Sequence, residues 1–281
     1  MTTMIAPAAP TAVALPAQAR AEIESDLAHR PALSLFVSGL RMSRDWREVG
    51  AAIVSGLPTE PELAERALLA VSRLLGPMLP QDGRGALVRQ VRYRGLSIAG
   101  SGTGRYSDSK DGGDWHTDGP HLPAEPPAAF VLLCVRQAGE GGELQLIDSA
   151  QVVGQLRPDT VAVLQQPFHF DQREQGAPPV PRPVLTRTFD GWQLAYLREY
   201  IESGHRLPGV PELTGPQRRA LDDLDRVIRA KAEDTRQHHE VKLCPGELVI
   251  VDNRSLIHGR RAFVADHTDR LMLRTWIGDR T

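Results

Sequence analysis

The sequence predicts a mainly β protein with added helices (α+β), built on a jelly-roll barrel. Many short apolar runs are separated by glycine turns, which is typical of all-β barrels. Amphipathic helices are expected near the N-terminus and in one insertion, whereas hardly any helical pattern occurs between residues 86 and 200. A doubly wound α/β fold needs a helix between successive strands, so this arrangement argues against it.

The elements of the first half follow from apolar periodicity. Residues 50–56 have the apolar run of a short strand, and residues 60–75 place apolar side chains at helical spacing. Residues 86–93 have strand character, whereas residues 101–113 are rich in Gly, Ser and Asp and predict a polar loop. Residues 129–135 form a continuous apolar run that is typical of a buried strand.

The second half continues the strand pattern. A turn at Glu140-Gly141-Gly142 leads into a strand at 143–147, and Phe189-Asp190-Gly191 is expected to be the turn of a hairpin. The proline-rich residues 178–183 predict an extended loop, because proline is excluded from the interior of sheets and helices. The remaining elements are the hairpin strands at 184–188 and 192–197, a helix at 217–232, and closing strands at 247–251 and 270–277.

The chain is long enough for one domain with insertions. Its 281 residues are 41% hydrophobic and 24% charged, as in ordinary globular proteins. Residues 1–18 are rich in Ala, Pro and Thr and predict a disordered tail. We expect residues 19–281 to form a single domain with the jelly-roll core, in which residues from about 165 to 240 are an inserted lid and helix region.

Charge and cysteine content argue against several classes of function. The net charge of −2 and the pI near 6.5 provide no field that would attract nucleic acid or a membrane surface. The sequence has no apolar run long enough for a membrane span, and its N-terminal stretch lacks the basic residues of a signal peptide. Cys134 and Cys244 lack metal-binding or disulfide spacing, so we expect a reduced, cytoplasmic setting.

His116 and Asp118 form one of four His-X-acid pairs in the sequence, so such a pair alone carries little weight. This pair differs because a polar loop precedes it and can give a ligand access. In an extended segment, residues two apart point to the same face. His258, which follows the strand at 247–251 after a turn, can complete a set of two imidazoles and one carboxylate. Such a set leaves open positions on an octahedral ion, which suits Fe(II) oxygen chemistry.

The other histidines favour a simpler interpretation, a surface or structural role. His169-Phe170-Asp171 lacks the access loop, and His238-His239-Glu240 follows a charged helix end. His267-Thr268-Asp269 has no later histidine that could complete a site.

Arginine side chains of the last strand are expected to point into the barrel. Alternation puts Leu271, Leu273 and Ile277 on one face, and Arg270, Met272, Arg274 and Trp276 on the other. A buried guanidinium needs an anionic partner, either one of the protein's own acids or a ligand with a carboxylate. The basic cluster of Arg84, Arg89, Arg92 and Arg94 is either a solvated strand face or a pocket wall for an acidic substrate.

In addition to His258, several motifs follow one another along the sequence. They are Trp115-His116-Thr117-Asp118-Gly119, Pro126-Pro127 leading into residues 130–136, Gly141-Gly142-Glu143, Pro183-Val184-Leu185-Thr186, Leu197-Arg198-Glu199-Tyr200 and residues 244–254. Arg270 follows His258 by twelve residues. In motif, order and spacing the chain resembles the Fe(II)/2-oxoglutarate-dependent oxygenases of the taurine dioxygenase and clavaminate synthase-like type. The resemblance implies a double-stranded β-helix, in agreement with the jelly roll.

The resemblance also implies a role for each matching residue. His116, Asp118 and His258 would bind Fe(II). Arg270 would bind the distal carboxylate of 2-oxoglutarate, while the keto acid end of this co-substrate chelates the iron. O2 is the third reactant of the family.

Two further arginines match positions that face the substrate in relatives. Arg274 matches a position that contacts an anionic substrate group, and Arg198 lies in a segment that faces the substrate in amino acid hydroxylases. Leu144 departs from the pattern, because many taurine-type members have a threonine there that hydrogen-bonds 2-oxoglutarate. Either another hydroxyl replaces it or Arg270 acts more alone. Asp118 is intact, whereas halogenases of the superfamily replace this ligand with a small residue, so halogenation is not expected.

The implied reaction oxidises a C–H bond and converts 2-oxoglutarate to succinate and CO2. We expect hydroxylation of a small, polar, amino-acid-derived metabolite in natural-product biosynthesis, with residues 101–113 and 172–183 as lids. Alternatives are the catabolism of taurine or another sulfonate, and a desaturation, epoxidation or cyclisation outcome. A cupin-like metal enzyme without 2-oxoglutarate and a binding protein without activity are the remaining alternatives.

Overall fold

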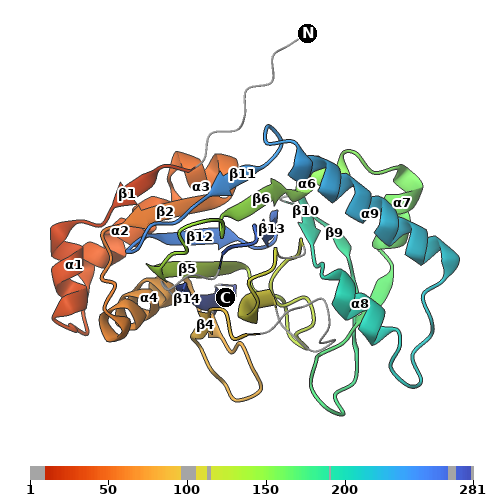
Figure 1. Cartoon of the computed structure of the whole chain (residues 1–281), viewed down its shortest axis with the longest axis horizontal. Helices are drawn as coiled ribbons and strands as arrows, with labels where there is room; N and C mark the ends of the chain where they lie inside the picture. The colour runs from red at the N-terminus through yellow and green to blue at the C-terminus, as the bar shows by residue number, and fades with distance from the viewer. Residues whose placement is uncertain (1–9, 96–105, 113–114, 190, 265–269, 280–281) are drawn as a thin grey trace, which may run out of the picture.

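Two β-sheets pack against each other, and helices cover the outside of both (Figure 1). The computed structural model describes residues 10–95, 106–112, 115–189, 191–264 and 270–279. The larger sheet has the strand order β1-β2-β12-β5-β14-β3, with β4 paired to β14, and the smaller sheet has the order β11-β6-β13. The strands are β1 (Ala12–Ala14), β2 (Ala51–Ser55), β3 (Met78–Leu79), β4 (Arg89–Val91), β5 (Ala129–Arg136), β6 (Leu144–Asp148), β11 (His239–Val241), β12 (Leu248–Asp252), β13 (Leu256–Arg260) and β14 (Leu271–Ile277). The jelly-roll prediction is therefore confirmed.

Side chains of the larger sheet alternate between an outer and an inner core. Along β14, Leu271, Leu273 and Ile277 pack against the N-terminal helices, whereas Met272 and Trp276 lie inside the barrel. This is the predicted alternation, and it directs Arg274 of the same strand inward. The helices on the outer face are α1 (Ala17–Glu24), α2 (Pro31–Arg41), α3 (Arg44–Val49) and α4 (Pro61–Leu75), with α4 close to its predicted bounds.

An insertion between β6 and β11 covers the outer face of the smaller sheet (Figure 1). It contains α6 (Ser149–Val153), α7 (Pro158–Leu164), α8 (Arg198–Gly204) and α9 (Gly215–Glu233), together with the pairs β7 (Pro167–Phe170) and β8 (Val180–Pro183), and β9 (Leu185–Thr188) and β10 (Gly191–Leu194). Helix α9 begins with a capping box in which Thr214 and Gln217 satisfy each other's backbone N–H groups. Its Leu221 and Leu224 pack in the same core as Ile147 of β6 and Ile257 of β13. This segment overlaps the region of about 165–240 that we expected as an insertion.

The predicted N-terminal tail is partly structured. Ala12–Ala14 form β1, which pairs in parallel with β2, and the next residue, Leu15, is buried. The prediction of a disordered tail is therefore wrong for these residues, because backbone pairing holds them even though their composition has little strand character. Residues 1–9 of the predicted tail lie outside the described residues.

The proline-rich segment is a strand and not a loop. Val180–Pro183 form β8, whose only partner among the described strands is β7. A two-stranded ladder leaves one edge of β8 without strand partners, so the missing N–H groups of Pro181 and Pro183 are tolerated there. The strand expected at 86–93 is also shorter than predicted, because only Arg89–Val91 pair with β14.

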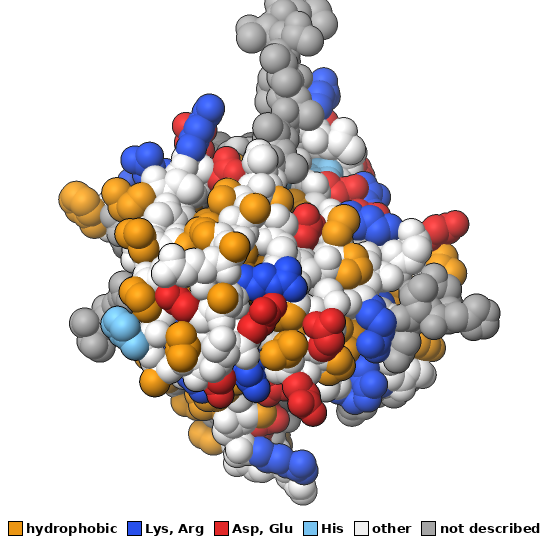
Figure 2. Space-filling model, turned by 90° about the vertical axis from the view of Figure 1, so that its left-hand side faces the viewer, with side chains coloured by type: hydrophobic (Ala, Val, Ile, Leu, Met, Phe, Trp, Pro, Cys, Tyr) orange, Lys and Arg blue, Asp and Glu red, His pale blue; other side chains and the backbone are white. Residues whose placement is uncertain are grey.

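The surface carries charges of both signs. On the face shown in Figure 2, acidic and basic side chains alternate among scattered hydrophobic ones, in keeping with the small net charge. None of the described helices is long and apolar enough to cross a membrane.

The turn before β6 gives a test of the fold. A Cβ on Gly141 would collide with the carbonyl oxygen of Ala262, and φ at Gly141 is +76°. We expect Gly141→Ala to destabilise the protein by roughly 3 kcal/mol or more, from overpacking and left-handed strain together. Gly176 has φ +78°, but a Cβ there would meet nothing within 4 Å, so Gly176→Ala should cost only about 1–2 kcal/mol. Urea unfolding compares the two variants, and equal losses would contradict the packing described.

Candidate active site

Backbone pairing brings His116 and His258 together. His116 is outside the named strands, but it forms an isolated antiparallel bridge with His258 of β13. Each backbone N–H donates to the other residue's carbonyl at 2.9 Å, and the two ring centroids are 4.3 Å apart. This single bridge brings the two imidazoles side by side.

Asp118 is fixed by the side chain of Asn253. The Asp118 N–H donates to Asn253 Oδ1 at 2.7 Å, and Asn253 Nδ2 donates to the carbonyl oxygens of Asp118 at 3.0 Å and of Pro127 at 2.9 Å. Asn253 is fully buried, so these bonds are shielded from water. Sequence reasoning missed this role, although Asn253 lies in one of the segments that carry the resemblance.

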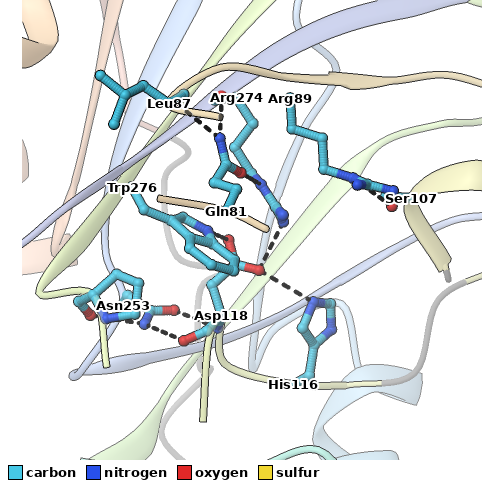
Figure 3. Close-up of polar contacts among 10 residues, drawn as sticks. Gln81, Leu87, Arg89, Ser107, His116, Asp118, Asn253, Arg274 and Trp276 are labelled. Atoms are coloured by element: carbon cyan, nitrogen blue, oxygen red, sulfur yellow. Dashed lines mark hydrogen bonds and ion pairs between the residues drawn. The ribbon is translucent and has the colours of Figure 1, made fainter. Parts of the chain in front are cut away.

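The Asp118 carboxylate has two further donors on β14. Arg274 Nη1 donates to Oδ1 at 2.7 Å, and Trp276 Nε1 donates to Oδ2 at 2.8 Å (Figure 3). His116 Nε2 lies 3.8 Å from the same Oδ1. Trp276 was predicted to point inward, but its hydrogen bond to Asp118 could not be predicted from the sequence. The carboxylate is therefore oriented by two side chains of β14.

The three side chains offer a ligand set for a metal ion. One donor atom from each of His116, Asp118 and His258 lies within 4.8 Å of the others, and they are the only such group of three or more among the described residues. His258 Nδ1 is buried and has no hydrogen-bond partner in the described part of the chain. Two imidazoles and a carboxylate whose donor atoms lie this close together fit an Fe(II) ion with open positions.

The electrostatic environment favours the metal-binding protonation states. Burial lowers the pKa of His258 to about 3, and the nearby His116 adds to this effect. Burial alone would raise the pKa of Asp118, but the charge of Arg274 and the neighbouring histidines outweigh it, and the pKa lies below its usual value. At neutral pH, His258 is neutral and Asp118 is ionised, as metal ligands must be.

Arg270 lies in a pocket on one side of these three residues. Its side chain is buried, Nε donates to Gln137 Oε1 at 3.0 Å, and Nη1 has no hydrogen-bond partner among the described residues. Burial lowers the pKa of Arg270 to about 10, and the charge of Arg260 contributes. A Cβ on Gly142 would lie 3.1 Å from Arg270 Nε, so this glycine leaves room for the guanidinium. A buried cation with an unsatisfied donor fits an anionic ligand.

Arg274 and Arg89 line a second pocket on the other side. They are direct cross-strand partners in the β4–β14 ladder, and their side chains approach the same space (Figure 3). Arg89 binds Ser107 Oγ at 3.1 Å and Asp108 Oδ2 at 2.8 Å. Of the two interpretations of the basic cluster, the structure favours a pocket wall for Arg89. Ser107, His116, Asp118 and Arg274 line both pockets, so the two cavities meet beside the ligand set.

Arg198 is not brought to the site. At the start of α8 it binds Glu202, Asp222 and Asp225 at 2.7–3.0 Å, and it lines neither of the two pockets. The acids of α9 hold this arginine against the insertion, which the sequence pattern could not show. Its neighbour Glu199 lines the second pocket instead.

The rival His-X-acid pairs have other partners where the structure describes them. The backbone N–H of His169 donates to Nε2 of His205 at 3.1 Å. His238 is buried beside the carbonyl oxygens of Lys231 and Asp234. The pair at 267–269 lies outside the described residues.

The predicted lid at 172–183 contacts the chain just after residues 115–119, which include His116 and Asp118. Arg182 donates to the carbonyl oxygens of Pro120 at 2.8 Å and Ala124 at 2.7 Å. Of the other predicted lid, residues 101–105 and 113 lie outside the described residues, and Tyr106–Asp108 form a short 3-10 helix.

Comparison with known proteins decides the family. Residues 20–276 match the model of the "Taurine catabolism dioxygenase TauD, TfdA family". The chain belongs to this dioxygenase family. Proteins that are similar to it include FR-33289 synthase of Streptomyces rubellomurinus, which is 29% identical over 81% of this chain and 68% of that protein. A uridine-5'-phosphate dioxygenase of an Amycolatopsis species is 27% identical over 77% of this chain and 80% of that protein.

A solved structure of asparagine oxygenase has the same fold. It contains Fe(II), 3-hydroxyasparagine and succinate, and it superimposes with a TM-score of 0.68 at 25% identity, covering 92% of this chain and 82% of that chain. The prediction of a taurine dioxygenase-like family and of an enzyme is therefore confirmed.

The depressed pKa of His258 gives a test in the metal-free protein. We expect its ring to stay neutral from pH 8 down to about 4, because its pKa is about 3, whereas an ordinary histidine titrates near 6.5. The unfolded chain binds this proton near pH 6.5 and the folded chain does not, so this residue reduces stability as the pH falls from 6.5 to about 3. NMR titration of the His258 Cε1–H signal measures the pKa, and a midpoint near 6.5 would contradict the buried site.

Proposed function

We propose that the protein is an Fe(II)- and 2-oxoglutarate-dependent oxygenase that hydroxylates a small, amino-acid-derived metabolite. His116, Asp118 and His258 would hold the iron, and Arg270 would bind the distal carboxylate of 2-oxoglutarate. The observation that carries this proposal is the position of Arg270, whose unsatisfied Nη1 lies in a pocket that opens on the three ligand residues. We further propose that residues 19–281 act as one domain, with the segment at about 165–240 as its insertion.

The chemistry of the bound iron and 2-oxoglutarate is activation of O2, with succinate and CO2 as co-products, for the oxidation of a C–H bond. The chain's own residues supply position and charge. Asn253 fixes the backbone of Asp118 and Trp276 fixes its carboxylate, so this residue would need little reorganisation when the site is loaded. Phe130, Leu132 and Leu144 line the pocket beside Arg270 and exclude water from it.

The pair of Arg89 and Arg274 supports a substrate with an anionic group. Like charges directly opposite each other on neighbouring strands destabilise a sheet, and here Asp108 and Asp118 offset them. When Asp118 serves as a metal ligand, it shares its charge with the ion, and Arg274 then gains from a second anion. A carboxylate or phosphate beside Arg274 and Arg89 would meet this need.

The compounds named for two of the relatives are consistent with an anionic group on the substrate. The asparagine oxygenase structure contains an amino acid product, and the Amycolatopsis relative is named for a phosphate ester. We therefore favour an amino-acid-derived substrate in natural-product biosynthesis, with phosphate-bearing metabolites as the second candidate. A sulfonate substrate would use the same two arginines.

Binding of 2-oxoglutarate tests the proposal. Under anaerobic conditions, Fe(II) and 2-oxoglutarate should give the visible charge-transfer band of the chelate. Arg270→Gln should weaken 2-oxoglutarate binding at least thirtyfold, about 2 kcal/mol, because a buried charge-assisted pair is lost. The exposed Arg187, which stacks on Trp192 away from both pockets, provides the control Arg187→Gln. A wild-type protein that binds Fe(II) without the band would instead support a cupin-like metal enzyme.

Substrate charge gives a second test. A panel of amino acids, carboxylates, sulfonates and phosphate esters can be screened by the shift that a bound substrate causes in the band. We expect the active compounds to carry an anion, and Arg89→Gln to weaken their binding about tenfold while the band itself persists. An uncharged substrate, or binding that is unchanged in Arg89→Gln, would refute the role of this pair.

A further inference from the structure

Arg260 is a second arginine in the pocket of Arg270. It ends β13, two residues after His258, so both side chains are on the same face of the strand. Arg260 as a whole is half-buried, and its side chain lines the pocket that contains Arg270. Its Nε is buried and, like Nη1 of Arg270, has no hydrogen-bond partner among the described residues.

The register of the smaller sheet places Arg260 directly opposite Leu144 of β6. Directly opposite residues have their Cβ atoms about 5 Å apart, and both side chains line the pocket. The Leu144 side chain supplies no hydrogen-bond donor, so it cannot bind a carboxylate. On this side of the pocket, the side chain that can donate is Arg260.

The two arginines share one aromatic neighbour. Their guanidinium carbons lie 5.0 Å and 5.3 Å from the centroid of the Phe263 ring, for Arg260 and Arg270 respectively. Arg260 Nη2 donates to neutral acceptors, the carbonyl oxygens of Ser109 at 2.9 Å and Asp111 at 2.6 Å. Two buried guanidinium donors without acceptors in one pocket point to a missing acceptor between them.

We propose that Arg260 is a second binding residue for the distal carboxylate of 2-oxoglutarate. This inference rests on the proposed function. Nη1 of Arg270 and Nε of Arg260 donate to the carboxylate, and Arg260 provides the donor that Leu144 lacks. The contacts of Arg260 Nη2 remain in place, because a different nitrogen makes them. Through Arg260, the carboxylate is connected to Ser109 and Asp111, which precede His116 and Asp118 in the sequence.

A purely structural role is the competing explanation. In that case Arg260 would only anchor the segment of Ser109 and Asp111, and its loss would affect every ligand of the site equally. A ligand without the distal carboxylate separates the two roles. Pyruvate keeps the keto acid end of 2-oxoglutarate and lacks the distal carboxylate.

The test is the anaerobic dissociation constant of the Fe(II) protein for 2-oxoglutarate and for pyruvate. We expect Arg260→Gln to weaken 2-oxoglutarate binding at least about tenfold and to change pyruvate binding less than about twofold. The neighbouring Arg261, which is exposed and binds Glu240, gives the matched control Arg261→Gln with no effect on either. Leu144→Thr added to Arg260→Gln should recover part of the lost affinity, because it places a hydroxyl donor opposite position 260.

Equal weakening of both ligands in Arg260→Gln, or no weakening of 2-oxoglutarate, would overturn the assignment. If Arg260→Gln does not fold, Arg260→Lys replaces it, since lysine keeps the charge and can reach the carbonyl oxygens but has no Nε–H. This variant should bind 2-oxoglutarate at least about threefold more weakly, with pyruvate unchanged, and wild-type affinity would overturn the assignment. Failure of Arg270→Gln to weaken 2-oxoglutarate would instead refute the proposed function, so the two failures are distinguishable.

Discussion

Two reciprocal hydrogen bonds between the backbones of His116 and His258 are the constraint on which the site depends. They join a segment outside the named strands to β13, and they bring two imidazoles from distant parts of the sequence to a ring distance of 4.3 Å. Asp118 then follows two residues later, and Asn253 fixes its backbone. The ligand set is thus positioned by the main chain, which side-chain rearrangements cannot easily displace.

The interior of the barrel combines a hydrophobic core with several charges. Inward positions of β14 hold Met272 and Trp276 in the core, while Arg274 pairs with Asp118 at the pocket. Burying a guanidinium is costly unless an anion satisfies it, so each inward arginine requires an anionic partner nearby. Arg274 has its anion within the protein, whereas Nη1 of Arg270 has no acceptor among the described residues. This difference supports separate roles for the two arginines: Arg274 orients Asp118, and Arg270 is the one that we propose for the co-substrate.

The sequence predicted the fold class and the alternation of β14, because apolar periodicity is a local feature. Motif order singled out His116, Asp118 and His258, whose side chains the fold brings together. It did not predict interactions that depend on distant partners. Composition suggested a loop for β8 and a tail for β1, yet pairing with β7 and β2 makes them strands. Arg198 lies in a segment that matches a substrate-facing segment of relatives, but Asp222 and Asp225 of α9 bind it away from the pockets. Strand register places Arg89 opposite Arg274 and Arg260 opposite Leu144. Register depends on two strands together, so the sequence of either strand alone does not predict it.

We propose that His116, Asp118 and His258 form one iron site, with Arg270 placed for 2-oxoglutarate. A crystal structure grown anaerobically with Fe(II) and 2-oxoglutarate, with an anomalous difference map at the iron absorption edge, tests it most directly. We expect one iron peak bound by these three side chains, with the distal carboxylate of the co-substrate at the Arg270 guanidinium. An iron peak at other residues, or 2-oxoglutarate bound away from Arg270, would contradict it.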